Sequence, residues 1–304
     1  MFGYTGKILH VDATSHQSWV EEKSAEYLKK YIGGIGLATR LLYENTPAKI
    51  DPLGPQNALC FGTSSFAGTT VPVGTKHGVV FKSPLTGFIG DCLSGSHFSE
   101  MIRRAGWDGF VITGAAPEWS VLFIDDDDVQ FLDASRFMGM GTSQTQQAIR
   151  EWLGDENVRV SSIGPAGENL VRYALIDNDG RQAGRTGPGA VMGSKKLKAI
   201  VIKGTGSVGN FDDNKLQEMG KKGYAEIKGK SSYDFWMKQG TMQAFDWANE
   251  NACLPTYNYR EGVFELSKEM DGYVVEKLHA GRKGCPLCNM QCGHLIKDSS
   301  DREA

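Results

Sequence analysis

Short apolar segments alternate with turns over the first two hundred residues of the chain. Segments of four or five residues that are rich in Val, Ile and Phe and bounded by Gly, Pro, Asp or Asn are typical of β-strands. We expect strands at residues 7–11, 58–61, 78–81, 109–112, 121–124, 158–162, 173–176 and 199–202. The pattern predicts a sheet-dominated domain, and its spacing is too irregular for a repeating βαβ array.

Helical periodicity interrupts these strands in four places. Apolar residues recur every three or four positions there, which is typical of amphipathic helices. We expect helices at residues 25–31, ended by Gly33, and at 37–44, 98–105 and 143–153, with Ser143 as the N-cap of the last.

The pattern changes near residue 208. Residues 212–227 and 242–250 have helical periodicity with charged faces, and strand signals fade. We therefore expect a β-sheet-rich domain over residues 1–208 and a mainly helical domain over residues 209–304.

Charge and hydropathy exclude several classes of partner. The 304 residues include 33 Lys and Arg and 36 Asp and Glu, a formal net charge of −3, so no bulk field favours nucleic acid or an acidic membrane. No segment approaches the roughly 18 apolar residues of a membrane span, and the N-terminus lacks a signal-peptide pattern. We expect a cytoplasmic protein that binds neither nucleic acid nor membrane.

Glycine-rich segments at residues 162–169 and 181–195 indicate a loop system that binds an anion. Glycine lets successive backbone N–H groups turn inward and form a concave donor nest. Arg181, Arg185 and Lys195 are expected to supply the positive charge. The spacing fails the phosphate-binding G-x-x-x-x-G-K-[ST] pattern, so a nucleotidase is disfavoured.

Two other patterns have plainer interpretations. Residues 34–36 lack the third glycine of a dinucleotide fingerprint, so turns and helix caps are favoured there. Lys76 and His77 precede a small-residue turn system at residues 82–96 that would let a ligand approach the backbone. Taken alone, these two residues favour a solvated loop.

Three cysteines within eight positions indicate a metal centre in a reducing compartment. Cys285, Cys288 and Cys292 supply soft ligands for an iron–sulfur cluster that takes a fourth ligand elsewhere, or for a zinc site that His294 completes. Two residues and then three separate these cysteines, the reverse of the order in the radical-SAM pattern, which counts against that class. The other cysteines are expected to be buried or free thiols: Cys60, Cys92 and Cys253.

A series of motifs in order along almost the whole chain resembles the aldehyde ferredoxin oxidoreductase family. The motifs are residues 4–12, 31–38, 82–89, 104–108, 162–169 and 189–199 and the Cys285 cluster. The resemblance implies an α+β fold, with an N-terminal domain of two β-sheets related by approximate two-fold symmetry and flanked by helices. The start of a mainly helical domain would follow.

The same resemblance implies the cofactors and the residues that hold them. Tungsten, or molybdenum, would be held by two pyranopterins whose phosphates are bridged by magnesium, beside a [4Fe–4S] cluster that passes electrons to ferredoxin. By motif match, Lys76 would contact a phosphate, and the backbone carbonyls of Leu93 and Ala183 would face magnesium. The pterin would be lined by Gly95, Gly184 and Arg185, and by Arg181, which adjoins a gap in the match. The first three cluster ligands would be Cys285, Cys288 and Cys292.

The implied activity is oxidation of an aldehyde to a carboxylic acid, under anaerobic conditions, with ferredoxin as electron acceptor. Members of the family are about twice as long, and the half with no counterpart here holds the fourth cluster cysteine and the groups near the substrate. We therefore assign no catalytic residue. We expect an N-terminal fragment or split subunit that is inactive without a C-terminal-half subunit, or that pairs with a second copy. The alternatives are a noncatalytic pterin- or zinc-binding module and a family member acting on another substrate, such as an aromatic thioester.

Overall fold

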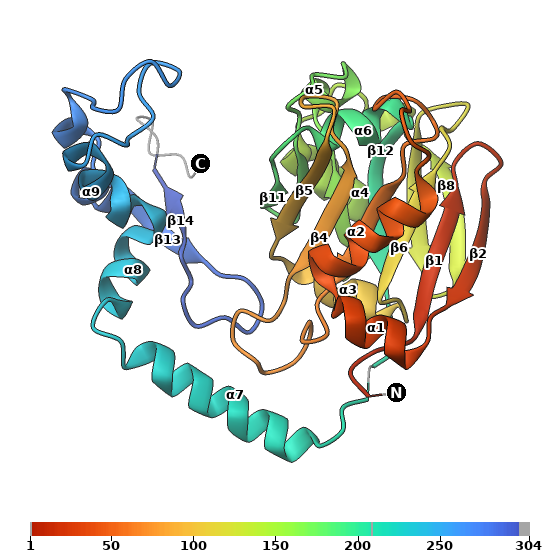
Figure 1. Ribbon diagram of the computed structural model, residues 1–304, viewed down its shortest axis with the longest axis horizontal. Helices are drawn as coiled ribbons and strands as arrows, with labels where there is room; N and C mark the ends of the chain where they lie inside the picture. Colours follow the sequence, from red (N-terminus) through yellow and green to blue (C-terminus); the bar gives the residue numbers. More distant parts are fainter. Residues whose placement is uncertain (1, 208, 298–304) are drawn as a thin grey trace. The chain divides into compact units, whose positions relative to one another are not determined.

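A computed structural model describes residues 2–207 and 209–297 (Figure 1). The chain divides into two compact units, residues 1–216 and 217–304, called unit 1 and unit 2 below. No helix within the described ranges is long and apolar enough to cross a membrane.

Unit 1 contains two mixed sheets of six strands each. The first has the order β2-β1-β6-β3-β4-β5 and is built from β1 (Lys7–Asp12), β2 (Gln17–Glu22), β3 (Leu59–Thr63), β4 (His77–Lys82), β5 (Ile89–Ser94) and β6 (Gly109–Thr113). The second has the order β8-β7-β12-β9-β10-β11 and is built from β7 (Ser120–Asp125), β8 (Asp128–Asp133), β9 (Arg159–Ser162), β10 (Ile176–Asn178), β11 (Arg181–Ala183) and β12 (Leu197–Lys203).

The two sheets share one topology, strand for strand. In the first sheet β1 and β6 pair in parallel and every other neighbouring pair is antiparallel. In the second, β7 and β12 are the parallel pair, and the other pairs are again antiparallel. This duplication confirms the predicted fold of two β-sheets with flanking helices.

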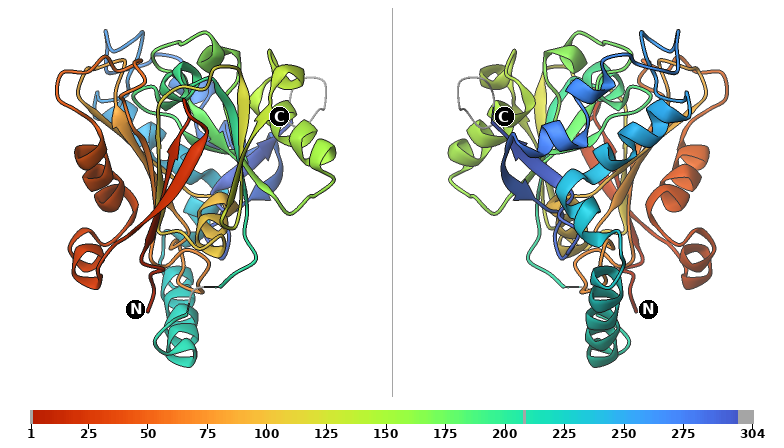
Figure 2. Two further views of the ribbon diagram at one scale, coloured as in Figure 1. Left: turned by 90° about the vertical axis from the view of Figure 1, so that its right-hand side faces the viewer. Right: turned by 90° about the vertical axis from the view of Figure 1, so that its left-hand side faces the viewer.

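Helices flank the sheets and fill the space between them. They are α1 (Ala25–Tyr31), α2 (Gly34–Asn45), α3 (His97–Arg104), α4 (Thr142–Leu153), α5 (Pro165–Glu168) and α6 (Pro188–Ser194). Figure 2 shows α1 and α2 outside the first sheet and α4 on the opposite side, outside the second. Side chains of α3 and α6 join strands of both sheets in one central core.

Because successive side chains of a strand point to opposite faces of its sheet, alternate residues pack in the central core and in an outer core. In β12, Ile200 and Ile202 point into the central core, whereas Ala199 and Val201 pack in the outer core beneath α4. On the first sheet, Cys60 and Val80 face the outer core with α2.

Glycines bring α2 very close to the first sheet. A Cβ atom on Gly62 would lie 2.4 Å from the carbonyl oxygen of Gly34, and one on Gly78 would lie 2.7 Å from the Ile35 nitrogen. Only a residue without a side chain allows this approach. The N-terminus of α2 is therefore held against β3 and β4.

Several predicted elements differ from the structure. Strands β2, β5 and β8 have no counterpart in the prediction because polar residues or glycine interrupt or flank their apolar residues, so none reads as a continuous apolar run. The strand expected at residues 173–176 was misplaced, since the chain turns there and β10 begins at Ile176. Ser143 does not cap α4; the cap is Gly141, whose N–H donates to the side chain of Gln144. Helix α1 ends where Ile32, not Gly33, takes up its C-cap position.

Unit 2 combines short helices with a β-hairpin. Its helical elements are α7 (Asp213–Lys228), which begins in unit 1, and α8 (Tyr233–Gln239), α9 (Phe245–Glu250) and α10 (Gly272–Glu276). The strands β13 (His279–Lys283) and β14 (Gly293–Ile296) pair antiparallel. The sequence did not predict this hairpin, because its strands are short and only partly buried and so give a weak strand signal.

Candidate cofactor site

The predicted cofactor residues of unit 1 gather where the two sheets meet. Leu93 lies on β5 and Gly95 directly follows it, while Arg181 and Ala183 lie on β11. Strands β5 and β11 are edge strands of their sheets and lie against each other. An edge strand leaves part of its backbone unpaired, so carbonyl groups remain available for a ligand.

Side chains of one sheet bind backbone groups of the other along this seam, which we define as the contacts of residues 83–95 with residues 178–186. The Ser94 hydroxyl donates to the Arg181 carbonyl over 3.1 Å. The Cys92 thiol donates to the Arg185 carbonyl over 3.0 Å, and the Ser83 hydroxyl donates to the Thr186 carbonyl over 2.7 Å. These contacts fix residues 181–186 relative to β5.

Lys76 and Leu93 line a cavity of about 380 Å³. Gly33 and Gly34, at the N-terminus of α2, line it as well. The N-cap Gly33 offers no side chain to accept from the first turn, so N–H groups remain there for a ligand. The positive end of the helix dipole and the lysine both favour a bound anion.

Two strained residues border the same cavity. Ile32 and Val73 have φ angles of 64° in the left-handed region, where a β-branched side chain clashes with its own backbone. Such strain persists only where the surrounding structure enforces it, and it is concentrated at ligand sites. Gly34, with φ of 52°, would place a Cβ atom more than 4 Å from any other atom, so the space beside it is open.

The structure corrects the expected roles of two basic residues. Lys195 does not supply charge to a surface loop, because it is fully buried and its ammonium donates to the carbonyls of Gly114 and Pro55, over 3.0 and 3.4 Å. Burial lowers the pKa of Lys195 to about 8. His77 does not lie in a solvated loop either; it is the first residue of β4 and is fully buried.

The glycine block after β9 has a packing role that the sequence did not reveal. A Cβ atom on Gly193 would lie 2.0 Å from the Gly167 carbonyl oxygen, so α5 and α6 are in contact through glycines. Glu168, at the end of α5, forms an ion pair with the buried ammonium of Lys198. This pair holds α5 to β12.

Gly33, Gly34 and Val73 are among the lining positions that the sequence interpretation missed. Residues 34–36, expected to form turns and a helix cap, form the first turn of α2, and its N-cap is Gly33; the pattern does not show that this helix end borders the cavity of Lys76. A helix N-terminus with glycine as N-cap is the sequence signal that could have identified this part of the cavity.

The three clustered cysteines lie in the loop of the β13–β14 hairpin. Cys285 and Cys288 are partly buried and Cys292 is exposed. Contacts from helices support the loop: the Tyr233 hydroxyl donates to the Asn289 carbonyl over 2.9 Å. Over residues 2–207 and 209–297, no three or more His, Cys, Asp and Glu side chains are grouped so as to hold a metal ion.

His294, the alternative zinc ligand, lies on β14. Its Nε2 lies 2.9 Å from the Met237 carbonyl oxygen, and its ring stacks on His279 at 4.1 Å. Because a carbonyl only accepts, Nε2 carries the hydrogen and Nδ1 is the nitrogen left for a metal.

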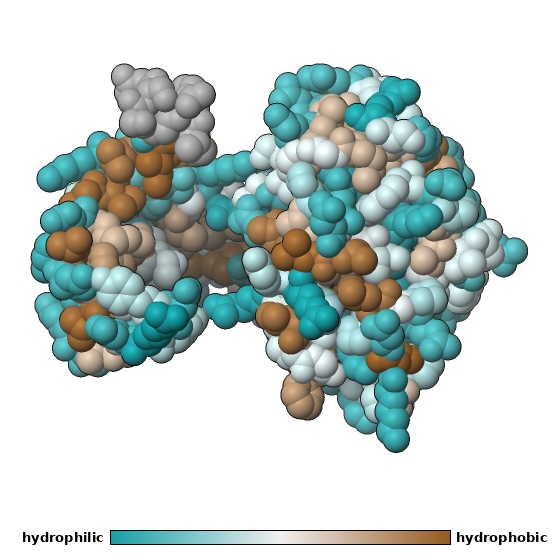
Figure 3. Space-filling view, turned by 90° about the horizontal axis from the view of Figure 1, so that it is seen from above, coloured by the Kyte–Doolittle hydropathy of each residue, from teal (hydrophilic) through white to brown (hydrophobic). Residues whose placement is uncertain are grey.

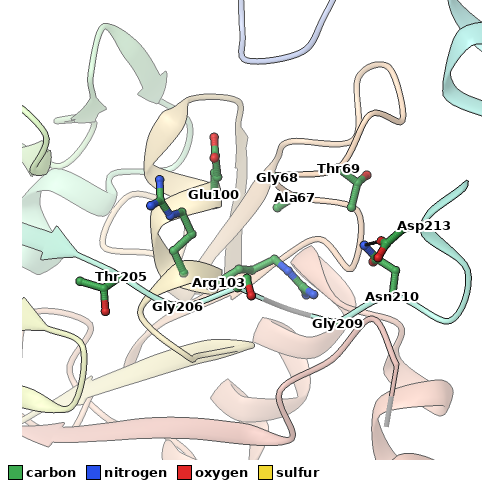
Figure 4. A pocket seen from close by; sticks show the side chains of 12 residues that line it. Ala67, Gly68, Thr69, Glu100, Arg103, Thr205, Gly206, Gly209, Asn210 and Asp213 are labelled. Carbon is green, nitrogen blue, oxygen red and sulfur yellow. Dashed lines mark hydrogen bonds between the residues drawn. The ribbon is translucent and has the colours of Figure 1, made fainter. Parts of the chain in front are cut away.

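A second cavity of about 580 Å³ lies elsewhere in unit 1 and contains none of the predicted site residues. Residues 67–69, α3 and residues 205–207, 209, 210 and 213 line it (Figure 4). The Arg103 side chain extends along it, but its guanidinium donates to the Gly3 carbonyl over 2.7 Å and lies 3.6 Å from Asp108. The buried charge there is balanced within the protein.

Unit 1 also exposes apolar side chains. Ile89 and Leu93 on β5 are 53% and 51% exposed. Figure 3 shows a brown, apolar patch on the face of unit 1 that is seen from above. Contiguous apolar surface is typical of faces that bind a large ligand or another polypeptide.

Comparison with known proteins identifies the family. The model described as "Aldehyde ferredoxin oxidoreductase, N-terminal domain" matches residues 8–204, and "Aldehyde ferredoxin oxidoreductase, domains 2 & 3" matches residues 218–304. The chain belongs to the aldehyde ferredoxin oxidoreductase family of oxidoreductases.

Comparisons with individual relatives support this assignment. The chain is 40% identical over 298 residues to a "Tungsten-containing aldehyde ferredoxin oxidoreductase" of Pyrococcus abyssi, a match over 97% of this chain and 49% of the relative. It is 31% identical over 334 residues to an "Aliphatic sulfonate oxidoreductase, WOR-like subunit" of Pyrococcus furiosus, over 100% of this chain and 53% of the relative. The chain thus spans about half the length of these relatives.

A solved structure is similar as well. The "Active site complex BamBC of Benzoyl Coenzyme A reductase in complex with 1,5 Dienoyl-CoA" superimposes with a TM-score of 0.85 at 26% identity, over 99% of this chain and 48% of the other.

Proposed function

We propose that the chain forms part of a tungstopterin and iron–sulfur oxidoreductase that oxidises aldehydes to carboxylic acids with ferredoxin as electron acceptor. The observation that carries the proposal is the cavity of the first sheet that Lys76, the N-terminus of α2 and Leu93, at the edge of β5, line together. Such a combination of lysine, helix N-terminus and exposed strand edge suits a phosphate-bearing cofactor.

The residues on the two sides of the seam would divide the binding of the cofactor. Lys76 and the α2 amides would hold a phosphate, Leu93 and Ala183 would offer carbonyl oxygens to magnesium, and Gly95, Arg181, Gly184 and Arg185 would line the pterin. Carbonyl oxygens are the hard ligands that Mg²⁺ prefers. When bound, tungsten, or molybdenum in its place, would supply the two-electron chemistry, which is the cofactor's own.

The hairpin loop of unit 2 would hold the electron-transfer cluster. Cys285, Cys288 and Cys292 supply three of the thiolates that a [4Fe–4S] cluster takes, and their partial exposure leaves them open to a metal. The fourth ligand is left to a residue outside this loop.

The complete activity would require groups beyond those of these 304 residues. Since the chain spans about half the length of its relatives, we propose that the remaining ligand and the substrate pocket come from the half that has no counterpart here, whether that half continues this chain or is supplied by a C-terminal-half subunit or a second copy. By itself, the 304-residue chain would not oxidise aldehydes, and measurable turnover would contradict this part of the proposal.

A different substrate is the second candidate. Relatives named for an aliphatic sulfonate and for benzoyl coenzyme A share this architecture, so an aromatic thioester or another compound could take the place of an aldehyde at the same cofactor. A noncatalytic pterin- or zinc-binding module is the third, favoured by the place of His294 in the sequence, two residues after Cys292.

Elemental analysis of protein purified anaerobically, with co-purifying chains retained, tests these alternatives. The proposal expects tungsten and about four irons per chain. About one zinc per chain without tungsten would support the binding module. If tungsten is present, assays with aldehydes, sulfonates and aromatic thioesters would separate the two catalytic candidates.

A further inference from the structure

The thiol of Cys92 is bound on two sides by one residue of the other sheet. Its Sγ donates to the Arg185 carbonyl over 3.0 Å and accepts the Arg185 N–H over 3.3 Å. A thiol has a single hydrogen to donate, and its sulfur is a weak acceptor, so this pair of contacts uses its hydrogen-bonding capacity in both directions. The contact is shielded from solvent, because Cys92 is 5% exposed.

The neutral form of the thiol is the one that can make both contacts. Burial raises the pKa of Cys92 to about 11, with the Arg185 N–H opposing the shift. At neutral pH the hydrogen is therefore present. Cys92 is thus poorly suited to be a nucleophile or a metal ligand, since both roles need the thiolate.

A second contact, two residues along β5, holds the other end of the same segment. Because Ser94 and Cys92 lie on one side of the strand, both face the second sheet: Ser94 reaches Arg181 on β11, and Cys92 reaches Arg185 just after it. The Ser94 hydroxyl donates to the Arg181 carbonyl, which also accepts from Asn178 over 3.1 Å. Residues 181–185 are thus fixed at both ends.

The segment between these two contacts contains most of the second sheet's contribution to the proposed cofactor site. Arg185 leads directly into Thr186 and Gly187, whose φ angles of 62° and 89° are both left-handed. At Thr186, which is not a glycine, such a conformation is held by the neighbours rather than by the residue's own preference. Loss of the Cys92 contact would remove two hydrogen bonds from Arg185 at the start of this turn and leave its carbonyl to the Thr186 hydroxyl.

We propose that Cys92 is a positioning residue of the cofactor site: its thiol fixes the Arg185 peptide, and through it the distance between Leu93 on one sheet and residues 183–185 on the other. The inference rests on the proposed function, in which those residues surround the phosphate-bearing pterin. Cys92 acts through Arg185 and does not itself touch the cofactor.

The test compares Cys92→Ala and Cys92→Ser with a matched control, Cys60→Ala, in the full chain with its co-purifying partners. Cys60 is the other buried thiol of the first sheet, and its side chain packs in the outer core with α2. Two quantities are measured: amide hydrogen exchange of residues 184–187 in cofactor-free protein, and tungsten and pterin per chain after anaerobic purification.

In Cys92→Ala we expect exchange at residues 184–187 to become at least about fivefold faster, since one ordinary hydrogen bond contributes roughly that factor and the variant removes two, with β3 and β4 unchanged. Tungsten and pterin occupancy should fall by a similar factor. Cys92→Ser, whose hydroxyl can donate and accept, should restore both quantities, and Cys60→Ala should leave exchange at residues 184–187 unaltered.

Unchanged exchange in Cys92→Ala would overturn the inference, as would equal acceleration in Cys60→Ala. Full cofactor occupancy in Cys92→Ala beside a loaded wild-type protein would overturn it while leaving the proposed function intact. A wild-type protein without tungsten and pterin would overturn the proposed function, whereas the exchange measurement would still report whether Cys92 holds Arg185.

Discussion

The carboxylate of Glu168 forms an ion pair with the ammonium of Lys198, and this ammonium is fully buried. Burial lowers the pKa of Lys198, and Glu168 opposes the shift. The Lys198 ammonium also donates to the Met140 carbonyl over 2.9 Å, and the Glu168 carboxylate accepts the Gly139 N–H over 3.0 Å. The pair therefore connects α5, β12 and the turn before α4.

Removing one partner of this pair should be costly. Lys198→Met leaves the carboxylate without its cation, and we expect it to lower the free energy of unfolding by about 3–5 kcal/mol. The double variant Lys198→Met/Glu168→Gln should lose much less, because no uncompensated charge remains. Denaturant unfolding of Lys198→Met, Glu168→Gln and the double variant gives the coupling free energy between the two side chains. Additive losses of unfolding free energy would contradict the ion pair's role.

His77 should make the protein sensitive to acid. Burial lowers the pKa of its imidazole to about 4, with the charge of Lys76 adding to the shift and Asn178 opposing it. The unfolded chain, with an ordinary histidine pKa of about 6.5, binds the proton first as the pH falls. Stability from this residue is thus fully present above about pH 6.5 and is lost down to about pH 4, a total of roughly 3 kcal/mol.

The variant His77→Phe isolates that contribution. Phenylalanine can keep the packing against Phe61 and Phe98, and it removes two ring nitrogens that are buried without a hydrogen-bond partner in the described structure. We expect its unfolding free energy to vary less between pH 7 and pH 4 than that of the wild type. A pH dependence as steep in His77→Phe as in the wild type would contradict this role of His77.

Gly78→Ala should push α2 away from the sheet. The added methyl group would lie 2.7 Å from the Ile35 nitrogen and 2.9 Å from backbone carbon of Gly34, so the helix must shift. We expect a loss of about 1–3 kcal/mol in unfolding free energy. Gly209→Ala, where nothing lies within 4 Å, should unfold like the wild type.

Lys76→Met should weaken binding of the phosphate-bearing cofactor. The variant removes the positive charge that lines the cavity at the α2 N-terminus. We expect at least a fivefold loss of pterin and tungsten per chain, since a charged hydrogen bond contributes about 1.5–3 kcal/mol. Lys82→Met is the control: its ammonium donates to the Ile50 carbonyl over 2.6 Å and lines a different cavity. Equal losses in both variants would contradict the role of Lys76.

Replacing a clustered cysteine should remove iron. We expect Cys288→Ser to lower iron per chain and to bleach the cluster's visible absorption, because serine is a harder and poorer ligand for iron–sulfur clusters. Cys253→Ser provides the control, since Cys253 is an exposed cysteine outside the hairpin loop. Retention of all iron in Cys288→Ser would argue against the cluster.

The sequence predicted the buried elements of unit 1 better than its edges. Strands such as β3, whose five residues are all buried, carry a continuous apolar signal. Edge strand β2 has none, since most of its residues face solvent and only the β1 ladder defines it. The hairpin in unit 2 went unrecognised for the same reason.

The sequence offers candidate site residues where a motif carries them, and it does not show where packing places a side chain. Arg185 and Leu93 follow from the resemblance to the family. The burial of Lys195 does not follow from it, because the sequence of a glycine-rich segment is the same whether its lysine faces solvent or donates to two buried carbonyls. The partnership of Cys92 with Arg185, 93 positions apart, likewise depends on tertiary structure.

Each sheet of unit 1 is built from one uninterrupted stretch, β1 to β6 and then β7 to β12, and residues 114–119 join them. A cut in that linker would sever no strand. The unit thus has the anatomy of a fused dimer, in which two sheets of one topology share a core. A ligand bound where β5 and β11 meet would take contacts from both sheets, so a change in either sheet would alter the same site.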